Sequence, residues 1–309
     1  MEPQIITVTL NPAIDHTIYV EKRGQEEVVK KEQFDIGGKG INVSKTLKRL
    51  GIESLAMGFV GGKSGSQIEA GLDELEIPHD FVRIHEPTRV NVKRVEASGQ
   101  VVEQNAPGPL VTKEELALFT KRLLSYCKPG ILVVLSGSIP RGVESNVYAE
   151  LIPMIKAKGA EVFLDTSKEA LRLATLAGPR YMKPNEEEFL ELTGLKEIPE
   201  KHKLRDTLNQ FFENGVETII ISCGKKGAWF VTKDEMFQTD SIKVEALSTV
   251  GAGDAMTAGF VAKSMQQNTS LWDRARFAVA AATGAVVTSG TSPSDIETVL
   301  FYELQVNKK

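Results

Sequence analysis

The strongest candidate for chemistry is a glycine-rich segment that ends in an acid, Thr249-Val250-Gly251-Ala252-Gly253-Asp254. The apolar run that follows it, Ala255 to Met265, predicts a helix. Glycines before a helix let the backbone approach a ligand closely, and the free N–H groups of the first helical turn attract anions. We therefore predict that backbone N–H groups stabilise a phosphoryl group during its transfer, those of Gly251, Ala252, Gly253 and Asp254.

Asp254 allows two interpretations. An aspartate in the first turn of a helix most often caps that helix. Here the carboxylate adjoins a predicted anion site, so it is also placed to accept a proton from a hydroxyl that attacks phosphorus. Because the combination is more specific than either part alone, we interpret Asp254 as the general base.

A second glycine-rich segment, Asp35-Ile36-Gly37-Gly38-Lys39-Gly40-Ile41-Asn42, precedes another predicted helix, which stops at Gly51. Its glycines allow close approach of a ligand, and Lys39 and Asn42 offer donors for sugar or phosphate oxygens. The segment matches neither the P-loop, which requires Gly-x-x-x-x-Gly-Lys before Ser or Thr, nor the dinucleotide-binding fingerprint. Taken alone, it fits a structural turn as well as it fits a ligand site.

The elements that must position these segments follow an α/β pattern. From about residue 110 onward, short β-branched runs alternate with longer amphipathic stretches, which predicts parallel strands joined by helices. The clearest strands are nearly all apolar, as expected for a sheet covered on both faces: 131–135, 162–165 and 218–222. Polar residues stand at the ends of such strands, where open α/β sheets bind ligands: Asp165, Asn185 and Ser222.

Two stretches, 11–36 and 86–106, depart from this pattern. Within the second, residues 88–95 alternate polar and apolar side chains, which predicts a strand with three polar residues on one face, Arg89, Asn91 and Lys93. A solvated edge strand would show the same alternation, but three side chains able to bind phosphate favour a site. We predict that the two stretches form a discontinuous β lid that excludes water from an α/β body made of residues 1–10, 37–85 and 107–309.

Length and charge restrict the partners. The 309 residues are 41% hydrophobic, which is enough for a large core, and the net charge of -4 argues against general binding to nucleic acid or a membrane surface. No apolar run reaches the roughly 20 residues that span a bilayer, and the N-terminus does not resemble a secretory signal. Cys127 and Cys223 show no metal-ligand spacing, so we expect a cytoplasmic protein with reduced thiols. Exposed strand edges in the lid lead us to expect a homodimer as well.

With these motifs, the chain resembles the ribokinase-like, or PfkB, carbohydrate kinases along essentially its whole length. The Gly37-Gly38-Lys39-Gly40-x-Asn42 block and the Gly251-Ala252-Gly253-Asp254 block resemble the two signatures of that family, in the same order. The resemblance implies a three-layer α/β sandwich with a mainly parallel central sheet and a small β-sheet lid. It also implies transfer of a phosphoryl group from ATP, with Mg²⁺, to a sugar hydroxyl.

Within the family, the segment Thr9-Leu10-Asn11-Pro12-Ala13-Ile14-Asp15 resembles the hexose-phosphate kinases, in which Asp15 would hold sugar hydroxyls. Residues 88–93 and 249–254 resemble the members that act on fructose 1-phosphate. We therefore expect ATP-dependent phosphorylation of D-fructose 1-phosphate at its 6-hydroxyl, giving D-fructose 1,6-bisphosphate. A tagatose-6-phosphate kinase is the alternative, and a non-catalytic sugar-phosphate sensor is a further one.

The resemblance also assigns the remaining site residues. Lys183-Pro184-Asn185-Glu186-Glu187-Glu188 resembles the family's Asn-x-x-Glu block, in which Glu188 would organise magnesium through water, although a plain acidic helix start looks the same. Ser222-Cys223-Gly224-Lys225-Lys226-Gly227 resembles an ATP-binding turn, although a glycine hairpin would fit it too. The predicted nucleotide-binding residues are Lys183, Asn185, Ser222, Gly224, Lys225 and Gly227. The predicted substrate-binding residues are Asp15, Gly38, Lys39, Asn42, Arg89, Asn91, Lys93, Ser136 and Gly137.

Overall fold

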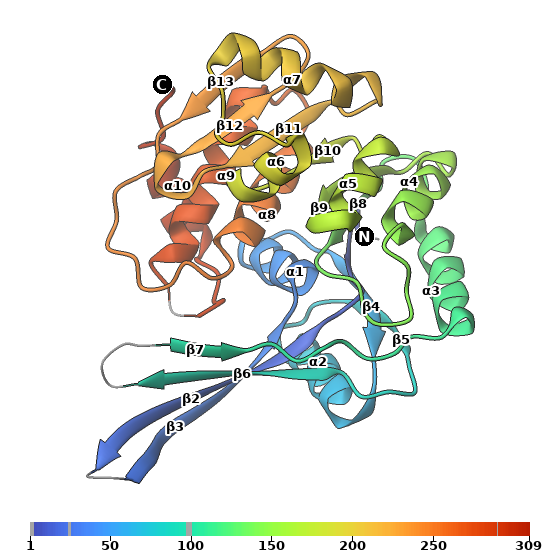
Figure 1. The fold of residues 1–309 in the computed structure, drawn as a ribbon, viewed down its shortest axis with the longest axis vertical. Coiled ribbons are helices and arrows are strands. Elements are labelled where there is room, and N and C mark those ends of the chain that lie inside the picture. The colour runs from blue at the N-terminus through green and yellow to red at the C-terminus, as the bar shows by residue number, and fades with distance from the viewer. Residues whose placement is uncertain (1–2, 24–25, 97–100, 289) are drawn as a thin grey trace.

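A nine-stranded sheet forms the centre of the molecule in the computed structural model, which describes residues 3–23, 26–96, 101–288 and 290–309 (Figure 1). The strand order is β13-β12-β11-β10-β9-β8-β1-β4-β5, and all neighbours are parallel except at β11-β12 and β12-β13. The strands are β1 Ile5–Thr9, β4 Leu55–Val60, β5 His79–Arg83, β8 Leu132–Ser136, β9 Glu161–Asp165, β10 Tyr181–Met182, β11 Thr218–Ser222, β12 Ala228–Val231 and β13 Met236–Thr239.

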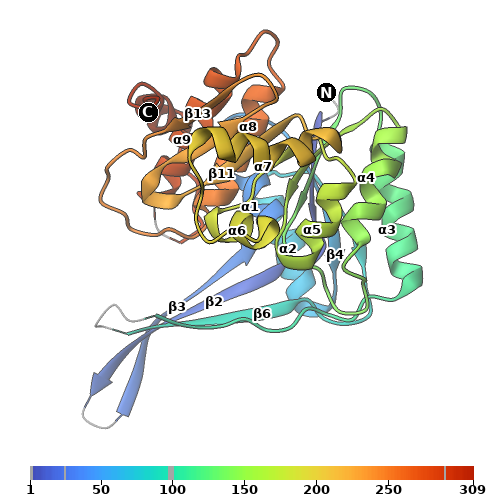
Figure 2. The same cartoon turned by 45° about the horizontal axis from the view of Figure 1, so that its top comes forward.

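Helices cover both faces of this sheet, which is why its strands are apolar on both sides (Figure 2). One layer contains α3 Lys113–Tyr126, α4 Val147–Ala157, α5 Lys168–Leu176, α6 Glu186–Thr193 and α7 Lys201–Glu213. The other contains α1 Lys39–Arg49, α2 Gly62–Glu74, α8 Ala252–Ser264, α9 Leu271–Val286 and α10 Ile296–Glu303. The predicted three-layer α/β sandwich is confirmed.

A separate four-stranded sheet extends away from this body (Figures 1 and 2). Its order is β3-β2-β6-β7, and only the β2-β6 pair is parallel. We name it the lid sheet, composed of β2 Ala13–Arg23, β3 Glu26–Gly37, β6 Arg89–Glu96 and β7 Val101–Gln104. At its base, Ile14 and Ile36 pack against Ile68 and Leu72 of α2. The lid boundaries of 11–36 and 86–106 stay a prediction, and residues 24–25 and 97–100 within them lie outside the described residues.

The register of the lid sheet explains the alternation seen in the sequence. Asp15 of β2 pairs with Asn91 of β6, so the polar residues of the two strands lie on one face. Ile14 of β2 pairs with Val90 of β6, and these apolar side chains lie on the opposite face. Across the described ranges, no helix is both long enough and apolar enough to span a membrane.

Candidate active site

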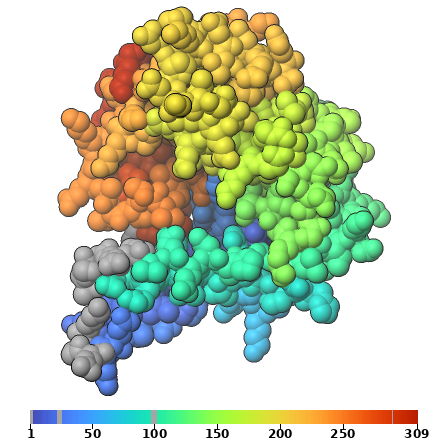
Figure 3. Space-filling model, in the orientation of Figure 1, coloured from blue at the N-terminus to red at the C-terminus, as the bar shows by residue number. Residues whose placement is uncertain are grey.

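The carboxyl ends of the parallel strands, the first turns of α1 and α8 and the lid sheet enclose a cavity of about 640 Å³. In the space-filling view, the lid sheet, coloured blue to teal, borders the hollow against the body (Figure 3). Most of the residues predicted from the sequence line this cavity: Asp15, Gly38, Lys39, Asn42, Arg89, Asn91, Lys93, Gly137, Lys183, Asn185, Glu188, Ser222, Gly224, Gly251, Gly253 and Asp254.

Four predicted residues are not among those that line it. Ser136 is fully buried in the last position of β8, so its backbone, rather than its side chain, shapes the neighbouring turn. Ala252 is the first residue of α8 and lies between the lining residues Gly251 and Gly253. Lys225 and Gly227 belong to the turn between β11 and β12, of which only Gly224 reaches the cavity.

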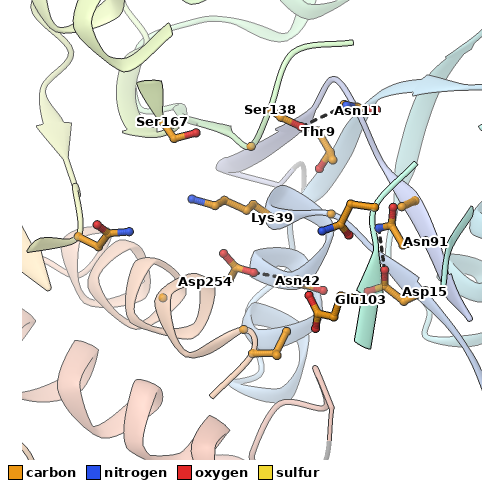
Figure 4. A pocket seen from close by; sticks show the side chains of 18 of the residues that line it. Thr9, Asn11, Asp15, Lys39, Asn42, Asn91, Glu103, Ser138, Ser167 and Asp254 are labelled. Atoms are coloured by element: carbon orange, nitrogen blue, oxygen red, sulfur yellow. Dashed lines mark hydrogen bonds between the residues drawn. The ribbon is translucent and has the colours of Figure 1, made fainter. Parts of the chain in front are cut away.

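Asp254 is held in place by a partner from another element. It lies in the first turn of α8, but the N-cap position is occupied by Gly251, which has a φ of 82°. Instead, Asn42 Nδ2 of α1 donates to Asp254 Oδ2 over 2.8 Å (Figure 4). The capping interpretation therefore does not apply, and the carboxylate faces the cavity next to the free N–H groups of the α8 first turn.

The surroundings of Asp254 raise its pKa to about 6. Burial is the main cause, since only 7% of the residue is exposed, and the negative charge of Asp165 adds to it. Lys39 and the Asn42 hydrogen bond act in the opposite direction. A carboxyl group that titrates near 6 is still ionised at neutral pH and is a stronger base than an exposed aspartate.

Asp165, at the end of β9, organises two of the cations. Its carboxylate pairs with Lys39 Nζ at 2.8 Å and with Lys183 Nζ at 3.0 Å, and it accepts a hydrogen bond from Thr257 Oγ1. Burial alone would raise the pKa of Asp165, but the two ammonium groups outweigh it and lower the pKa to about 2. Asp165 is thus a permanent anion that holds Lys39 and Lys183 at the cavity wall between the two glycine-rich segments.

The lid sheet contributes a second group of polar residues. Asn91 Nδ2 donates to Asp15 Oδ1 over 2.9 Å, and Lys93 Nζ lies 3.6 Å from Asp15 Oδ2. Arg89 donates to three backbone carbonyls, which are those of Pro12, Ala106 and Asn11. A guanidinium has five N–H donors, so two remain for a ligand while the group is held rigidly.

Of the described residues that line the cavity, eight were not assigned to the site from the sequence: Thr9, Asn11, Ala13, Glu103, Asn105, Ser138, Ser167 and Val250. Two of these, Asn11 and Ser138, contact each other. Asn11 is 6% exposed and its Nδ2 donates to Ser138 Oγ over 3.1 Å (Figure 4). In the described part of the chain, the buried Asn11 Oδ1 has no hydrogen-bond partner. Both residues follow the ends of neighbouring strands, β1 and β8, and a polar residue just after a buried strand was the available signal.

The comparisons with known proteins identify the family. A model of the pfkB family carbohydrate kinases matches residues 8–298. The chain belongs to this family.

Relatives of this carbohydrate kinase agree on the assignment. It is 37% identical over 287 residues to a 1-phosphofructokinase of Borreliella burgdorferi, covering 92% of each chain, and 36% identical to that of Bacillus subtilis, covering 85% of this chain and 86% of the relative. Among solved structures, phosphofructokinase-2 of Escherichia coli in complex with potassium aligns with a TM-score of 0.91, at 28% identity over 98% of this chain and 99% of that one.

The family membership indicates which ligands the cavity must hold. A carbohydrate kinase uses ATP, so the site must hold a phosphoryl donor and a sugar acceptor together. At one side, Asn185 and Ser222 form a parallel bridge that joins the start of α6 to the end of β11. Asn185 and Glu188 cap α6 reciprocally, each side chain bonding the other's backbone N–H over 2.8 Å. The resulting rigid polar edge lines the same cavity as Asp254 and the lid sheet.

Proposed function

We propose that this enzyme phosphorylates D-fructose 1-phosphate at the 6-hydroxyl, converting ATP and the sugar phosphate to ADP and D-fructose 1,6-bisphosphate. The observation that carries the proposal is the division of the cavity. Asp254 and the glycine turn belong to α8, and the cations Arg89 and Lys93 belong to β6 of the lid sheet, so a sugar with a phosphate at one end fits between them. The relatives named 1-phosphofructokinase support fructose 1-phosphate as that sugar.

Asp254 acts as the general base in this proposal. Its carboxylate takes the proton from the 6-hydroxyl as the oxygen attacks the γ-phosphorus of ATP. The backbone N–H groups at the start of α8 donate to the equatorial oxygens of the phosphoryl group, whose charge is greatest during transfer. Lys39 and Lys183 add positive charge on the same side, held by Asp165.

The lid sheet binds the other end of the sugar phosphate. The two unused donors of Arg89, together with Lys93, hold the 1-phosphate by charge-assisted hydrogen bonds. Asp15 and Asn42 orient the sugar hydroxyls, since both line the cavity and have polar atoms toward it. Gly38 is required by the fold of this turn: its φ is 123°, and a Cβ there would lie 2.6 Å from Thr9 Cγ2.

Magnesium is the metal we assign to this reaction. The described residues contain no cluster of three acidic, histidine or cysteine side chains that would hold a metal by themselves. This fits Mg²⁺, which typically binds one or two carboxylates and completes its shell with water and nucleotide phosphates. Glu188, fixed at the cavity edge by the α6 cap, would hold it through water. The ion would neutralise charge on the ATP phosphates.

We also propose that the enzyme is a cytoplasmic homodimer formed through the lid sheet. The face of that sheet turned away from the cavity exposes several large apolar side chains, which are Val29, Phe34, Val90 and Val102. Exposed apolar residues grouped on one face of a sheet are typical of an interface. ATP and sugar phosphates, the proposed substrates, are cytoplasmic metabolites.

Parallel coupled assays of ADP release test the substrate. Magnesium-ATP is supplied with fructose 1-phosphate, tagatose 6-phosphate, fructose 6-phosphate, ribose or adenosine. We expect kcat/KM to be highest for fructose 1-phosphate. A higher value for tagatose 6-phosphate or fructose 6-phosphate would reject the choice of sugar and leave the mechanism intact, whereas no turnover on any acceptor would favour a sugar-phosphate sensor.

A further inference from the structure

Lys45 is a half-buried cation that the proposed mechanism does not use. It lies on α1 one turn after Asn42, on the same side of the helix. Its Nζ donates to the carbonyl oxygen of Ile36 over 3.3 Å and to Thr291 Oγ1 over 3.2 Å. Both of these acceptors are uncharged oxygens, one from a backbone carbonyl and one from a hydroxyl.

Burial lowers the pKa of Lys45, while the more distant carboxylates of Asp35, Asp15 and Asp254 favour its charge. A desolvated ammonium without a directly bonded carboxylate contributes little to stability, because it loses its hydration and gains only neutral acceptors. Stabilisation of the fold therefore does not explain why a lysine occupies this position.

The two acceptors of Lys45 belong to different parts of the site. Ile36 is the penultimate residue of β3, where the lid sheet joins the body. Thr291 lies in the connection between α9 and α10, and its Cα and side chain come within 3.8 Å of where a Cβ on Gly251 would stand. Gly251 is the N-cap of α8 and the first of the residues whose backbone N–H groups are predicted to bind the phosphoryl group.

We propose that Lys45 is a positioning residue that ties the base of the lid sheet to the glycine turn of α8. Through Ile36 it fixes where the lid sheet leaves the body, and through Thr291 it fixes the loop against which Gly251 packs. One ammonium group then aligns the backbone N–H groups at the start of α8 with the cavity face of the lid sheet. This inference rests on the proposed function, since it concerns the alignment of donor and acceptor in the same cavity.

The main test is a double-mutant cycle with Lys45→Met and Thr291→Val, both of which keep side-chain size and remove the hydrogen bond. We expect Lys45→Met to lower kcat by about tenfold to a hundredfold, the usual size of a small misalignment of reacting groups, with both KM values within threefold. The double variant should be no slower than Lys45→Met, because the two residues act through one contact. The proposal would be overturned if the kcat losses of the two single variants multiplied in the double variant. It would also be overturned if Lys45→Met kept kcat within twofold of wild type.

Two controls separate positioning from general damage. Lys48→Met removes an ammonium from the next turn of the same helix, where it bonds Glu76, and should leave kcat within twofold. Thr291→Ser keeps the hydroxyl and should retain near-normal kcat, so equal losses in Thr291→Ser and Thr291→Val would also reject the proposal. This pair remains decisive if Lys45→Met does not fold.

The comparison is made with whichever sugar phosphate the wild-type enzyme phosphorylates fastest. An error in the proposed substrate would then appear in the wild-type rates, whereas an error about Lys45 would appear in the ratios between variants. Melting temperatures are measured alongside. A fall in kcat that is matched by a fall in melting temperature for both lysine variants would contradict a positioning role.

Discussion

At the scale of single residues, Asp254 combines two properties that a base for phosphoryl transfer needs. Burial and the neighbouring Asp165 raise its pKa to about 6, and Asn42 fixes one carboxylate oxygen. The free oxygen can then face an incoming hydroxyl without rotation of the side chain. The same burial that strengthens the base destabilises its ionised form in the folded protein.

Asp254→Asn should therefore abolish most of the chemistry while preserving the site. The amide oxygen of the variant can still accept the Asn42 hydrogen bond, so we expect KM values within a few-fold of wild type. The turnover number should fall by roughly two to four orders of magnitude, the usual effect of losing a general base. Steady-state kinetics measure both, and a near-normal turnover number would exclude Asp254 as the base.

The pH dependence follows from the same raised pKa. Because the base must be ionised, kcat/KM should fall about tenfold per pH unit below pH 6. If kcat/KM instead began to fall only near pH 4, Asp254 would not be the group that titrates.

The free energy of unfolding should change with pH in the opposite sense. A pKa raised from 3.8 to about 6 destabilises the fold above pH 6, and this penalty disappears as the pH falls.

Unfolding of Asp254→Asn measures that penalty directly. At pH 8 the variant should be more stable than wild type by up to about 3 kcal/mol, the equivalent of two pKa units. The difference should shrink toward pH 4, where the wild-type carboxyl group is protonated in the folded state. Denaturant titrations at both pH values provide the comparison, and an equal difference at each pH would contradict the electrostatic origin.

At the scale of elements, strand β6 of the lid sheet carries two kinds of side chain on its two faces. Arg89 and Lys93 face the cavity, whereas Arg94 points to the opposite face and pairs with Glu27. Both faces contain arginine, so charge alone does not distinguish them. The register of β6 against β2 decides that Arg89 is on the face that lines the cavity.

Arg89→Ala should accordingly raise the KM for the sugar phosphate by roughly tenfold to a hundredfold, the effect of losing a charge-assisted hydrogen bond. The KM for ATP should stay within about threefold, because the nucleotide residues lie on other elements. Arg94→Ala is the matched control on the same strand and should change neither value. Equal changes in both KM values for Arg89→Ala would remove Arg89 from phosphate binding.

At the scale of the whole molecule, the lid sheet extends from the body and is covered on only part of one face (Figure 1). Near its base, Ile14 and Ile36 are covered by α2, while Val90 beside Ile14 and Phe34 further along remain exposed. A projecting sheet with an uncovered apolar face is stabilised by pairing with a second copy.

The double variant Phe34→Lys/Val90→Lys should therefore shift the enzyme from dimer to monomer. Lysines on this face introduce like charges into the proposed interface without altering the cavity face. Size-exclusion chromatography with light scattering measures the mass of wild type and variant. A wild-type mass of one chain, or a variant mass equal to that of a wild-type dimer, would reject the lid sheet as the interface.

The sequence by itself determined the features that depend on neighbouring residues. The start of α8 with Asp254, the start of α1 with Lys39 and Asn42, and the alternation of β6 were all predicted, because helix starts and strand faces are encoded within a few residues. The layer arrangement was also predictable, since alternating strands and helices allow few topologies. The family resemblance extended these predictions to the substrate.

Only the tertiary structure decided which distant residues meet. Asp165 had been noted as a polar strand end, but its pairing with Lys39 and Lys183 depends on β9 lying beside β8 and β10. The contact of Asn11 with Ser138 likewise depends on β1 inserting between β4 and β8. Strand order is set by the packing of the entire chain and leaves no local signal, whereas helix starts and strand alternation do.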